Sequence, residues 1–327
     1  MSGSFSLAVG DYAHVQALFD GRVRVEGLDL RLLRLSAEQV IQRMMEHREF
    51  EIAEFSFAQY VALRASGDTS LIAIPVFPSR VFRHGSIFVR ADGPRDDPGA
   101  LNGGRIGVPE WVQTAGIWTR GILGEYLGVD VKSIEWIQAG VNQPGRRESA
   151  PLVLPEGIRY RTAAESTLTE MLELGEIDAI VTARPPASFT DGSGRAVRLF
   201  SDVPTVEREW WGRTGIFPIM HVVVLRRDAY EEARWIATSL VEAFTEAKRR
   251  SIAALTDNTY SHVPVPWVPD QLVELNPGGG EWWPYGVEPN RLTLDAFLRY
   301  CREQGVAPAD LEVDDLFAPE TLTAVRV

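Results

Sequence analysis

Two arginines and a histidine stand together at the end of an apolar segment, IPVFPSRVFRH (residues 74–84). Arg80, Arg83 and His84 fall within five residues of one another. A guanidinium group sets two parallel N–H donors opposite the two oxygens of a carboxylate, and an imidazole titrates near neutral pH. In apolar surroundings an unpaired arginine is costly unless an anion matches its charge. The pattern therefore predicts that Arg80 and Arg83 hold a carboxylate beside His84; the alternatives are a structural ion pair and an exposed loop.

Three further residues are candidates for acid–base chemistry. His221 opens the apolar segment HVVVL, and with His84 it is a candidate general acid, although a hydrogen-bonded core histidine is the alternative. Glu54 is an acid within the apolar segment IAEFS, where it either pairs with an arginine or acts as a base. Asp11 follows the first predicted strand and is a second candidate base.

The other candidate residues stand where predicted strands end, because ligands of open α/β domains bind at the carboxyl ends of strands. The candidate substrate-binding residues in these positions are Tyr12, Ser56, Glu110, Thr114, Arg146 and Arg184. Arg146 and Arg184 would add anion contacts from a second domain, and a solvated loop is the alternative for Arg146. Thr114 is also the predicted N-cap of a helix beginning at Ala115.

The segments that position these residues alternate between strand-like and helix-like patterns. Ser36 is a predicted N-cap for a helix over 37–50, and a second helix is predicted over 57–67. Apolar runs at 71–77 and 86–91 are typical of strands. This alternation predicts an α/β fold with a parallel or mixed sheet covered by helices on both faces.

Two such α/β units follow one another, and the chain then returns to the first. We expect a discontinuous first lobe over 1–91 plus 219–327 and a second lobe over 92–218. The chain would cross between the lobes near 88–93 and 215–222. A cleft between the lobes would then collect the strand ends that carry the candidate residues.

The composition excludes several classes of function. The 327 residues carry a net charge of −12, so no basic face is available for nucleic acid, and any anion site must be local. The single cysteine, Cys301, excludes a disulfide within the chain, and we expect it to be buried on a helix. No apolar run approaches the roughly 20 residues that span a bilayer. The N-terminus resembles no export leader, so we expect a cytoplasmic protein without membrane partners.

Motifs for metals and cofactors are also missing from the sequence. It contains no HxxxH, CxxC or HxH pattern, no GxGxxG or Walker loop, and no GxSxG elbow. We therefore predict no cofactor, and a divalent ion held by residues from separate loops stays as the open alternative.

Several segments, taken in order, carry a resemblance to a known family. They are LAVGDY, DGRVRVEGLDL, IAIPVFPSRVFRHGSIFV, RIGVPEW, GIWTRGIL, PGRRE, GIFPIMHVVV, WPYGVEPN and DLFAPETL. Together they resemble the 4,5-dihydroxyphthalate decarboxylase family from about Ser6 to Leu322. The resemblance implies a two-lobed type II periplasmic-binding-protein-like fold used as an enzyme. The family commonly carries a Thr-Arg pair shortly after GDY, whereas this chain has AHVQA at 13–17, which leaves the exact hydroxylated aromatic acid open.

The resemblance implies non-oxidative decarboxylation of a hydroxylated aromatic dicarboxylate by a carboxy-lyase that uses no organic cofactor. Glu54 or Asp11 would polarise a ring hydroxyl, and His84 or His221 would protonate the ring carbon that loses CO2. Arg80 and Arg83 would hold the retained carboxylate.

Two other functions stay open at this point. One is a solute-binding protein for an aromatic carboxylate, cytoplasmic or exported and without catalytic activity. The other is an enzyme for a different reaction on a hydroxylated aromatic acid. In each case the partner is a small aromatic carboxylate, and a homo-oligomer is possible.

Overall fold

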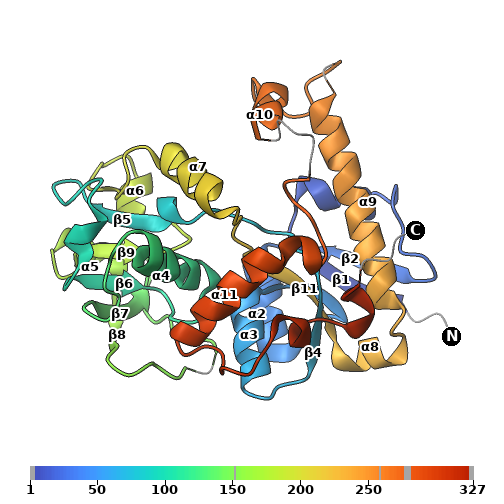
Figure 1. Cartoon of the computed structure of the whole chain (residues 1–327), viewed down its shortest axis with the longest axis horizontal. Coiled ribbons are helices and arrows are strands. Elements are labelled where there is room, and N and C mark those ends of the chain that lie inside the picture. The colour runs from blue at the N-terminus through green and yellow to red at the C-terminus, as the bar shows by residue number, and fades with distance from the viewer. Residues whose placement is uncertain (1–3, 151, 258, 276–280, 324–327) are drawn as a thin grey trace.

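The computed structural model describes residues 4–150, 152–257, 259–275 and 281–323. Its strands form two separate mixed sheets, one in each of two lobes (Figure 1). The α/β class and the two-lobed architecture expected from the sequence are both confirmed. Within the described residues, the helices include none that combines the length and the apolar character needed to cross a membrane.

The first lobe is built on a five-stranded sheet in the order β2-β1-β3-β11-β4. Its strands are β1 (Ser4–Val9), β2 (Asp29–Arg34), β3 (Ile52–Ser56), β4 (Leu71–Ile74) and β11 (His221–Arg226). Strand β1 is parallel to β2 and β3, whereas β11 is antiparallel to both of its neighbours. Because β11 is added only after the second lobe, the first lobe is discontinuous in sequence.

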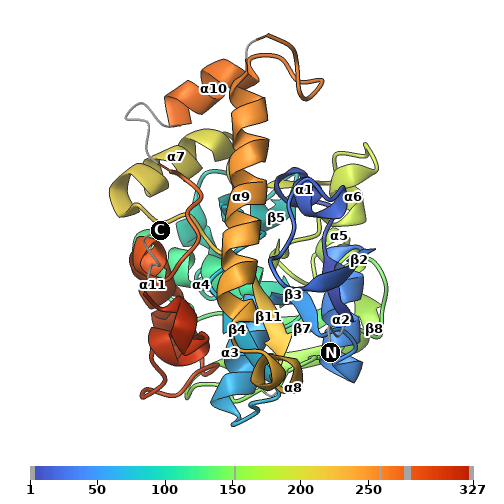
Figure 2. The ribbon, with the colours of Figure 1, turned by 90° about the vertical axis from the view of Figure 1, so that its right-hand side faces the viewer.

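Helices from both ends of the chain belong with this sheet. They are α1 (Gln16–Phe19), α2 (Ala37–His47), α3 (Phe57–Ala65), α8 (Arg227–Glu232), α9 (Ile236–Thr256), α10 (Val268–Leu275) and α11 (Arg291–Glu303). Helix α9 runs the height of the lobe, and α10 projects beyond its far end (Figure 2). The predicted cap of α2 is confirmed: the Ser36 hydroxyl accepts from the Gln39 N–H, and the Gln39 side-chain oxygen accepts from the Ser36 N–H.

The second lobe is built on a six-stranded sheet in the order β10-β5-β9-β6-β7-β8. Its strands are β5 (Ile87–Arg90), β6 (Arg105–Val108), β7 (Glu135–Gly140), β8 (Arg159–Thr167), β9 (Ala179–Val181) and β10 (Ala196–Arg198), and its helices are α4 (Thr114–Tyr126), α5 (Leu168–Glu173), α6 (Ala187–Thr190) and α7 (Val203–Thr214). Strand β6 is parallel to β7 and β9, so the loops after these three strands meet at one edge.

The first crossing between the lobes lies earlier in the chain than the sequence suggested. Strand β5, which we expected in the first lobe, pairs antiparallel with β9 and β10 of the second. The chain therefore crosses within 75–86 and returns within 215–220, and we call these two stretches the hinge segments. They pair with each other, because the Val81 N–H donates to the Pro218 carbonyl at 3.1 Å and the Met220 N–H to the Ser79 carbonyl at 2.8 Å.

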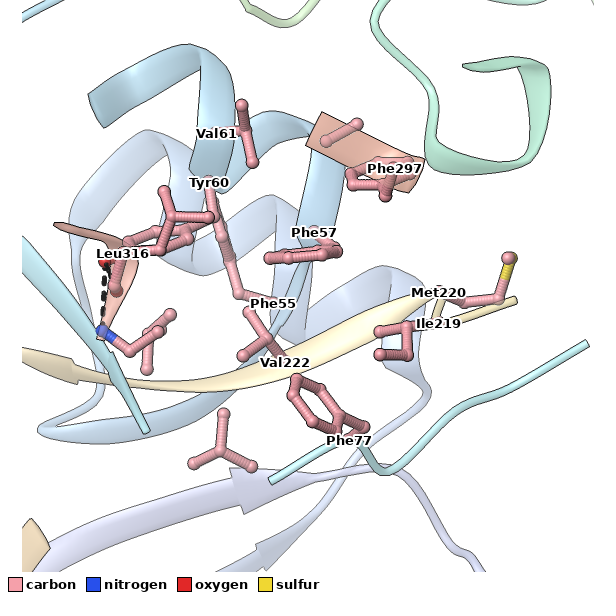
Figure 3. Packing of buried hydrophobic residues seen from close by; sticks show 14 of the residues in the cluster. Phe55, Phe57, Tyr60, Val61, Phe77, Ile219, Met220, Val222, Phe297 and Leu316 are labelled. Atoms are coloured by element: carbon pink, nitrogen blue, oxygen red, sulfur yellow. Dashed lines mark hydrogen bonds between the residues drawn. The ribbon is translucent and has the colours of Figure 1, made fainter. Parts of the chain in front are cut away.

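One continuous apolar core joins the first lobe to the C-terminal segment. Phe55, Phe57 and Val222 of the sheet region pack with Phe297 of α11 and with Leu316 (Figure 3). Phe57 stacks on Phe297 with ring centroids 4.8 Å apart. Burying such aromatic side chains contributes about 2–3 kcal/mol each, so α11 is held firmly against the first lobe.

Helix α11 also contacts the second lobe, because Phe297 lies 5.2 Å from Trp118 of α4, centroid to centroid. Cys301 on the same helix is buried, as expected, and burial raises the pKa of its thiol. A buried neutral thiol is a packing residue rather than a nucleophile.

Candidate active site

A cleft of about 1210 Å³ lies between the lobes and is lined by residues of both. The first lobe contributes Ser56 and His221, and the second contributes Glu110 and Thr114 from the loop after β6 and the start of α4. Arg83 reaches the same cleft from a hinge segment. The cleft therefore stands where the sequence placed it, at the strand ends between two α/β units.

His221 and Glu54 form a hydrogen-bonded pair on the first-lobe side of the cleft. The Nδ1 atom of His221 lies 2.5 Å from Oε1 of Glu54. Strands β3 and β11 are antiparallel neighbours in which Ser56 faces His221, so the register of the sheet brings these residues together. His221 is partly exposed and lines the cleft, whereas Glu54 is fully buried behind it. His221 is thus the member of the pair that can touch a bound molecule.

Two further donors hold the Glu54 carboxylate. The Gly10 N–H donates to Oε2 at 2.8 Å, and the Tyr12 hydroxyl donates to Oε1 at 2.6 Å. Burial by itself raises the pKa of Glu54, but the charge and hydrogen bond of His221, together with the donors Tyr12 and Gly10, bring that pKa below its usual value. Burial, and then the Glu54 charge, raises the pKa of the Tyr12 hydroxyl, which stays a donor. Glu54 is therefore an ionised, fully bonded carboxylate that orients His221.

The site depends on a glycine at position 10. A Cβ atom added there would lie 2.7 Å from the Tyr12 ring and 3.1 Å from Oε2 of Glu54. Real Cβ atoms do not approach other atoms as closely as 2.7 Å, so any side chain at this position would displace Tyr12. The glycine in the LAVGDY segment lets the Tyr12 ring close over the carboxylate.

Arg83 provides a cationic group in the cleft. Its Nε donates to the sulfur of Met220 at 3.0 Å, and Nη1 lies 3.5 Å from the Ser86 hydroxyl. Within residues 4–150, 152–257, 259–275 and 281–323, no carboxylate lies within ion-pair distance of this guanidinium. Burial lowers the pKa of Arg83 to about 10, and Glu207 opposes that shift only in part. A half-buried cation without a carboxylate partner fits an anionic ligand.

Arg80, which was predicted to bind the substrate carboxylate together with Arg83, lies outside the cleft instead. Its side chain is 5% exposed, does not line the cleft, and donates to the carbonyls of Phe217 at 3.1 Å and Pro284 at 2.9 Å and to the Asn290 side chain. Burial lowers the pKa of Arg80 to about 10. These bonds tie the two hinge segments to the stretch before α11. We therefore correct its predicted role from ligand binding to hinge stabilisation.

Two acid–base predictions also need correction. His84 is 2% exposed, packs against Phe200 and Trp210, and does not line the cleft; neither ring nitrogen has a hydrogen-bond partner among the described residues. Burial lowers its pKa to about 4, which keeps the ring neutral. Asp11 is exposed, does not line the cleft, and accepts from Gln16 at 2.6 Å. Neither residue is placed to protonate or deprotonate a molecule in the cleft.

Tyr12, another predicted binding residue, does not line the cleft either and acts through Glu54. Ser56 and Thr114 do line it, with their hydroxyl oxygens 3.1 Å apart across the lobes. Thr114 is the first residue of α4 rather than its cap, which is Gln113, and its hydroxyl accepts from the Ala58 N–H at 3.0 Å. The predicted cap is therefore wrong, because the threonine hydroxyl contacts the opposite lobe instead.

The remaining predicted residues form the second-lobe wall. Glu110 is buried and accepts from Nε and Nη2 of Arg146 at 2.8 and 2.6 Å, so Arg146 is paired rather than free. Arg184 lines the mouth of the cleft and donates to Glu38 of α2 at 2.5 Å, which links the lobes across the opening. Both arginines lie at the cleft, but each already has an acidic partner.

The part of the chain that the structure describes holds no group of three or more His, Cys, Asp or Glu side chains arranged to bind a metal ion. The expectation of a site without a cofactor, with a divalent ion as the alternative, stays a prediction.

Comparison with known proteins gives the family. The chain is 36% identical over 324 residues to a protein of Comamonas testosteroni named 4,5-dihydroxyphthalate decarboxylase, with 98% of each chain covered. The chain belongs to the 4,5-dihydroxyphthalate decarboxylase family. A protein of Pseudomonas putida with the same name is 36% identical over 209 residues, covering 64% of this chain and 81% of that one. Decarboxylases are carboxy-lyases, so by family the chain is an enzyme of that class. No family model matches the sequence.

Solved structures similar to this family member show the fold. The periplasmic aliphatic sulphonate binding protein SsuA of Escherichia coli gives a TM-score of 0.52 at 13% identity and covers 96% of this chain and 91% of its own. A putative sulfonate-binding SsuA of Methylobacillus flagellatus gives 0.54 at 14%, covering 98% and 92%. The desulfurization enzyme DSZB gives 0.51 at 16%, covering 97% of each chain. The decarboxylase family therefore shares its two-lobed fold with binding proteins and with another enzyme.

Two residues of this decarboxylase-family cleft were not singled out from the sequence. Gln59 of α3 donates to the Ser149 hydroxyl at 2.6 Å, a second contact between the lobes. Glu148 lies in the loop after β7 and lines the cleft beside Glu110. The PGRRE segment contains Glu148, but an acid in a polar loop carries no sequence signal that separates a buried carboxyl from a solvated one.

Proposed function

We propose that this protein catalyses the non-oxidative decarboxylation of a hydroxylated aromatic dicarboxylate of the 4,5-dihydroxyphthalate type, with His221 as the proton donor. The family membership supports the reaction class. The observation that carries the proposal is the position of the hydrogen-bonded His221–Glu54 pair, which faces the same cleft as Arg83, a cation with no carboxylate partner among the described residues. An imidazole and a cation in one cleft supply the two functions that the reaction requires, proton donation and anion binding.

The chemistry explains why a proton donor is needed. Direct loss of CO2 would leave an aryl carbanion, which is a high-energy species. If the ring carbon bearing the carboxylate is protonated first, a hydroxyl para to that carbon stabilises the cationic ring by donating electron density. The C–C bond to the carboxylate then breaks, its electron pair restores the aromatic ring, and CO2 leaves. One proton moves from His221 to the ring, and water from the open cleft replaces it.

Glu54 supports this step without contacting the substrate. Its carboxylate stabilises the protonated imidazole through Nδ1 and leaves Nε2 to donate. This assignment replaces the role of base that the sequence suggested, because Glu54 is fully buried and does not line the cleft. Tyr12 and Gly10 hold Glu54 in place, so they act as positioning residues.

Arg83 is assigned to the carboxylate that the product retains. Strong binding of the departing carboxylate would stabilise the ground state, because that negative charge disappears along the reaction. Binding of the retained carboxylate instead orients the ring in both ground and transition states. We expect Ser56 and Thr114 to bind the same substrate by hydroxyl donation, since both line the cleft.

The test is to incubate the purified protein with 4,5-dihydroxyphthalate in D2O and to follow CO2 and 3,4-dihydroxybenzoate. The proposal predicts one CO2 per product and one deuterium at the ring carbon that carried the carboxylate. Stoichiometric binding without CO2 release would instead identify a solute-binding protein, the role that the sulfonate-binding neighbours have. The cytoplasmic location and any homo-oligomer stay predictions.

A further inference from the structure

Two glutamates lie next to each other in the second-lobe wall of the cleft, in different surroundings. Glu110 has a cationic partner, Arg146, and also accepts from the Ser149 N–H at 3.2 Å and the Ser149 hydroxyl at 2.5 Å. Glu148 lines the cleft with no cation within ion-pair distance in the described part of the chain. Pairs of acids whose surroundings differ in this way often divide proton-transfer roles between them.

Glu148 is held rigidly by neutral donors. It accepts from the backbone N–H of Trp111, from the N–H of Val112 at 3.3 Å, and from the Tyr160 hydroxyl at 2.6 Å. Arg120 is the nearby buried cation, but its Nη2 donates to the Trp111 carbonyl at 2.6 Å rather than to the acid. The carboxyl group is therefore fixed in orientation, and its charge is not neutralised by a direct partner.

Glu148 and His221 line the same cleft, one from each lobe. Glu148 binds the backbone at 111–112, just before Thr114, whose hydroxyl lies 3.1 Å from that of Ser56. Ser56 is the sheet neighbour of His221. An aromatic ring between the two walls would present one edge to the first lobe and the opposite edge to the second.

We propose that Glu148 is the catalytic base that accepts the proton of the ring hydroxyl para to the departing carboxylate, an inference that rests on the decarboxylation proposed above. The hydroxyl proton moves to the Glu148 carboxylate, and the oxygen electron pair moves into the ring as His221 protonates the opposite carbon. After the C–C bond breaks and CO2 leaves, the proton returns from Glu148 to the hydroxyl oxygen. The net proton consumed still comes from His221.

The electrostatics of the wall support this role. Burial raises the pKa of Glu148, the neighbouring Glu110 charge raises it further, and the donors Trp111, Tyr160 and Val112 lower it in part. Burial, followed by the bond to Glu148, raises the pKa of Tyr160, which keeps that hydroxyl protonated and donating. A carboxylate of raised basicity is better matched to a phenolic proton than an exposed acid is.

The experiment compares Glu148→Gln with Glu165→Gln, which changes an exposed glutamate on β8 of the same lobe. Turnover is measured from pH 6 to pH 9 with 4-hydroxyphthalate and with a ring-fluorinated analogue whose hydroxyl is more acidic. We expect kcat of Glu148→Gln to fall about 100-fold near pH 7, the size of one general-base contribution. The deficit should shrink at high pH and on the fluorinated analogue, because an ionised hydroxyl needs no base. Glu165→Gln should keep the wild-type rates.

The outcomes separate this inference from the function on which it rests. Wild-type rates in Glu148→Gln, or a deficit equal at every pH and on both substrates, would overturn the role of base while leaving the decarboxylase assignment intact. Absence of CO2 release from 4,5-dihydroxyphthalate by the wild-type protein would overturn the proposed function itself. Equal substrate Kd values in Glu148→Gln and the wild type establish that the variant is folded and keeps its cleft.

Discussion

The two arginines of the 80–83 turn test most sharply whether Arg80 stabilises the hinge while Arg83 binds the substrate in the cleft. The guanidinium carbon of Arg80 lies over the rings of Phe77 and Phe217, 5.4 and 5.9 Å from their centroids, and Arg80→Met replaces this group with an apolar chain. The Phe217 carbonyl and the Asn290 side-chain oxygen lose the donor that the structure gives them, whereas the Pro284 carbonyl keeps a bond from Asn290 at 3.0 Å.

An orphaned buried acceptor costs about 1–3 kcal/mol, so two of them cost about 2–6 kcal/mol. At roughly 2 °C per kcal/mol for a large chain, the melting temperature should fall by about 4–12 °C. KM should stay near the wild-type value, because Arg80 does not line the cleft.

The matched change, Arg83→Met, should behave in the opposite way. In the part of the chain that the structure describes, Arg83 has only the sulfur of Met220 and a distant Ser86 hydroxyl as partners, so the melting temperature should move by less than about 2 °C. Loss of a charged contact to a carboxylate should raise KM by about 10–100-fold. The two variants are compared by thermal unfolding and by initial rates of CO2 release. An unchanged melting temperature together with a raised KM in Arg80→Met would refute this division and restore Arg80 as a ligand-binding residue.

Three further predictions concern charge and pH. The folded protein holds the pKa of Glu54 below its ordinary value of 4.5, so ionised Glu54 stabilises the fold at pH values above 4.5. This contribution is lost as the pH falls below 4.5 and through the lowered pKa, so urea unfolding of Glu54→Gln should depend less on acid pH than that of the wild type. The His84 pKa is about 4 in the folded protein and 6.5 in the unfolded chain, so between these pH values only the unfolded chain takes up the proton. The free energy of unfolding should therefore decrease by up to about 3 kcal/mol as the pH falls through this range. His84→Phe, whose ring suits the contacts with Phe200 and Trp210, should lack that decrease in the same unfolding titration. The exposed Glu38–Arg184 pair should contribute less than about 1 kcal/mol, so Glu38→Gln should leave the unfolding midpoint nearly unchanged; a large shift would contradict this weak, screened interaction.

Local patterns in the sequence predicted the fold well. The alternation of apolar strands with amphipathic helices gave the α/β class, and the Ser36 cap was correct because capping depends on residues three positions apart. The lobe boundary was placed too late, because strand β5 reads like any apolar strand. Which sheet it joins is decided by pairing with β9, some ninety residues further along the chain.

The site residues were predicted less accurately than the fold, because the sequence does not show which way each side chain points. Glu54 and His221 were named separately, but only the antiparallel register of β3 and β11 brings them into contact. Arg80 and Arg83 look equivalent in the sequence, yet Arg80 donates to the Phe217 carbonyl of the hinge, whereas Arg83 lines the cleft. His84 has the same residue type as His221, but it packs among aromatic side chains, and no described residue hydrogen-bonds to its ring.

The measurement that tests the central claim most directly is the single-turnover rate of CO2 release in His221→Asn, alongside the Kd of the same variant for 4,5-dihydroxyphthalate. If His221 supplies the proton, the rate should fall by at least about 100-fold while the Kd changes by less than about threefold. A variant that binds the substrate and releases CO2 at the wild-type rate would contradict the account.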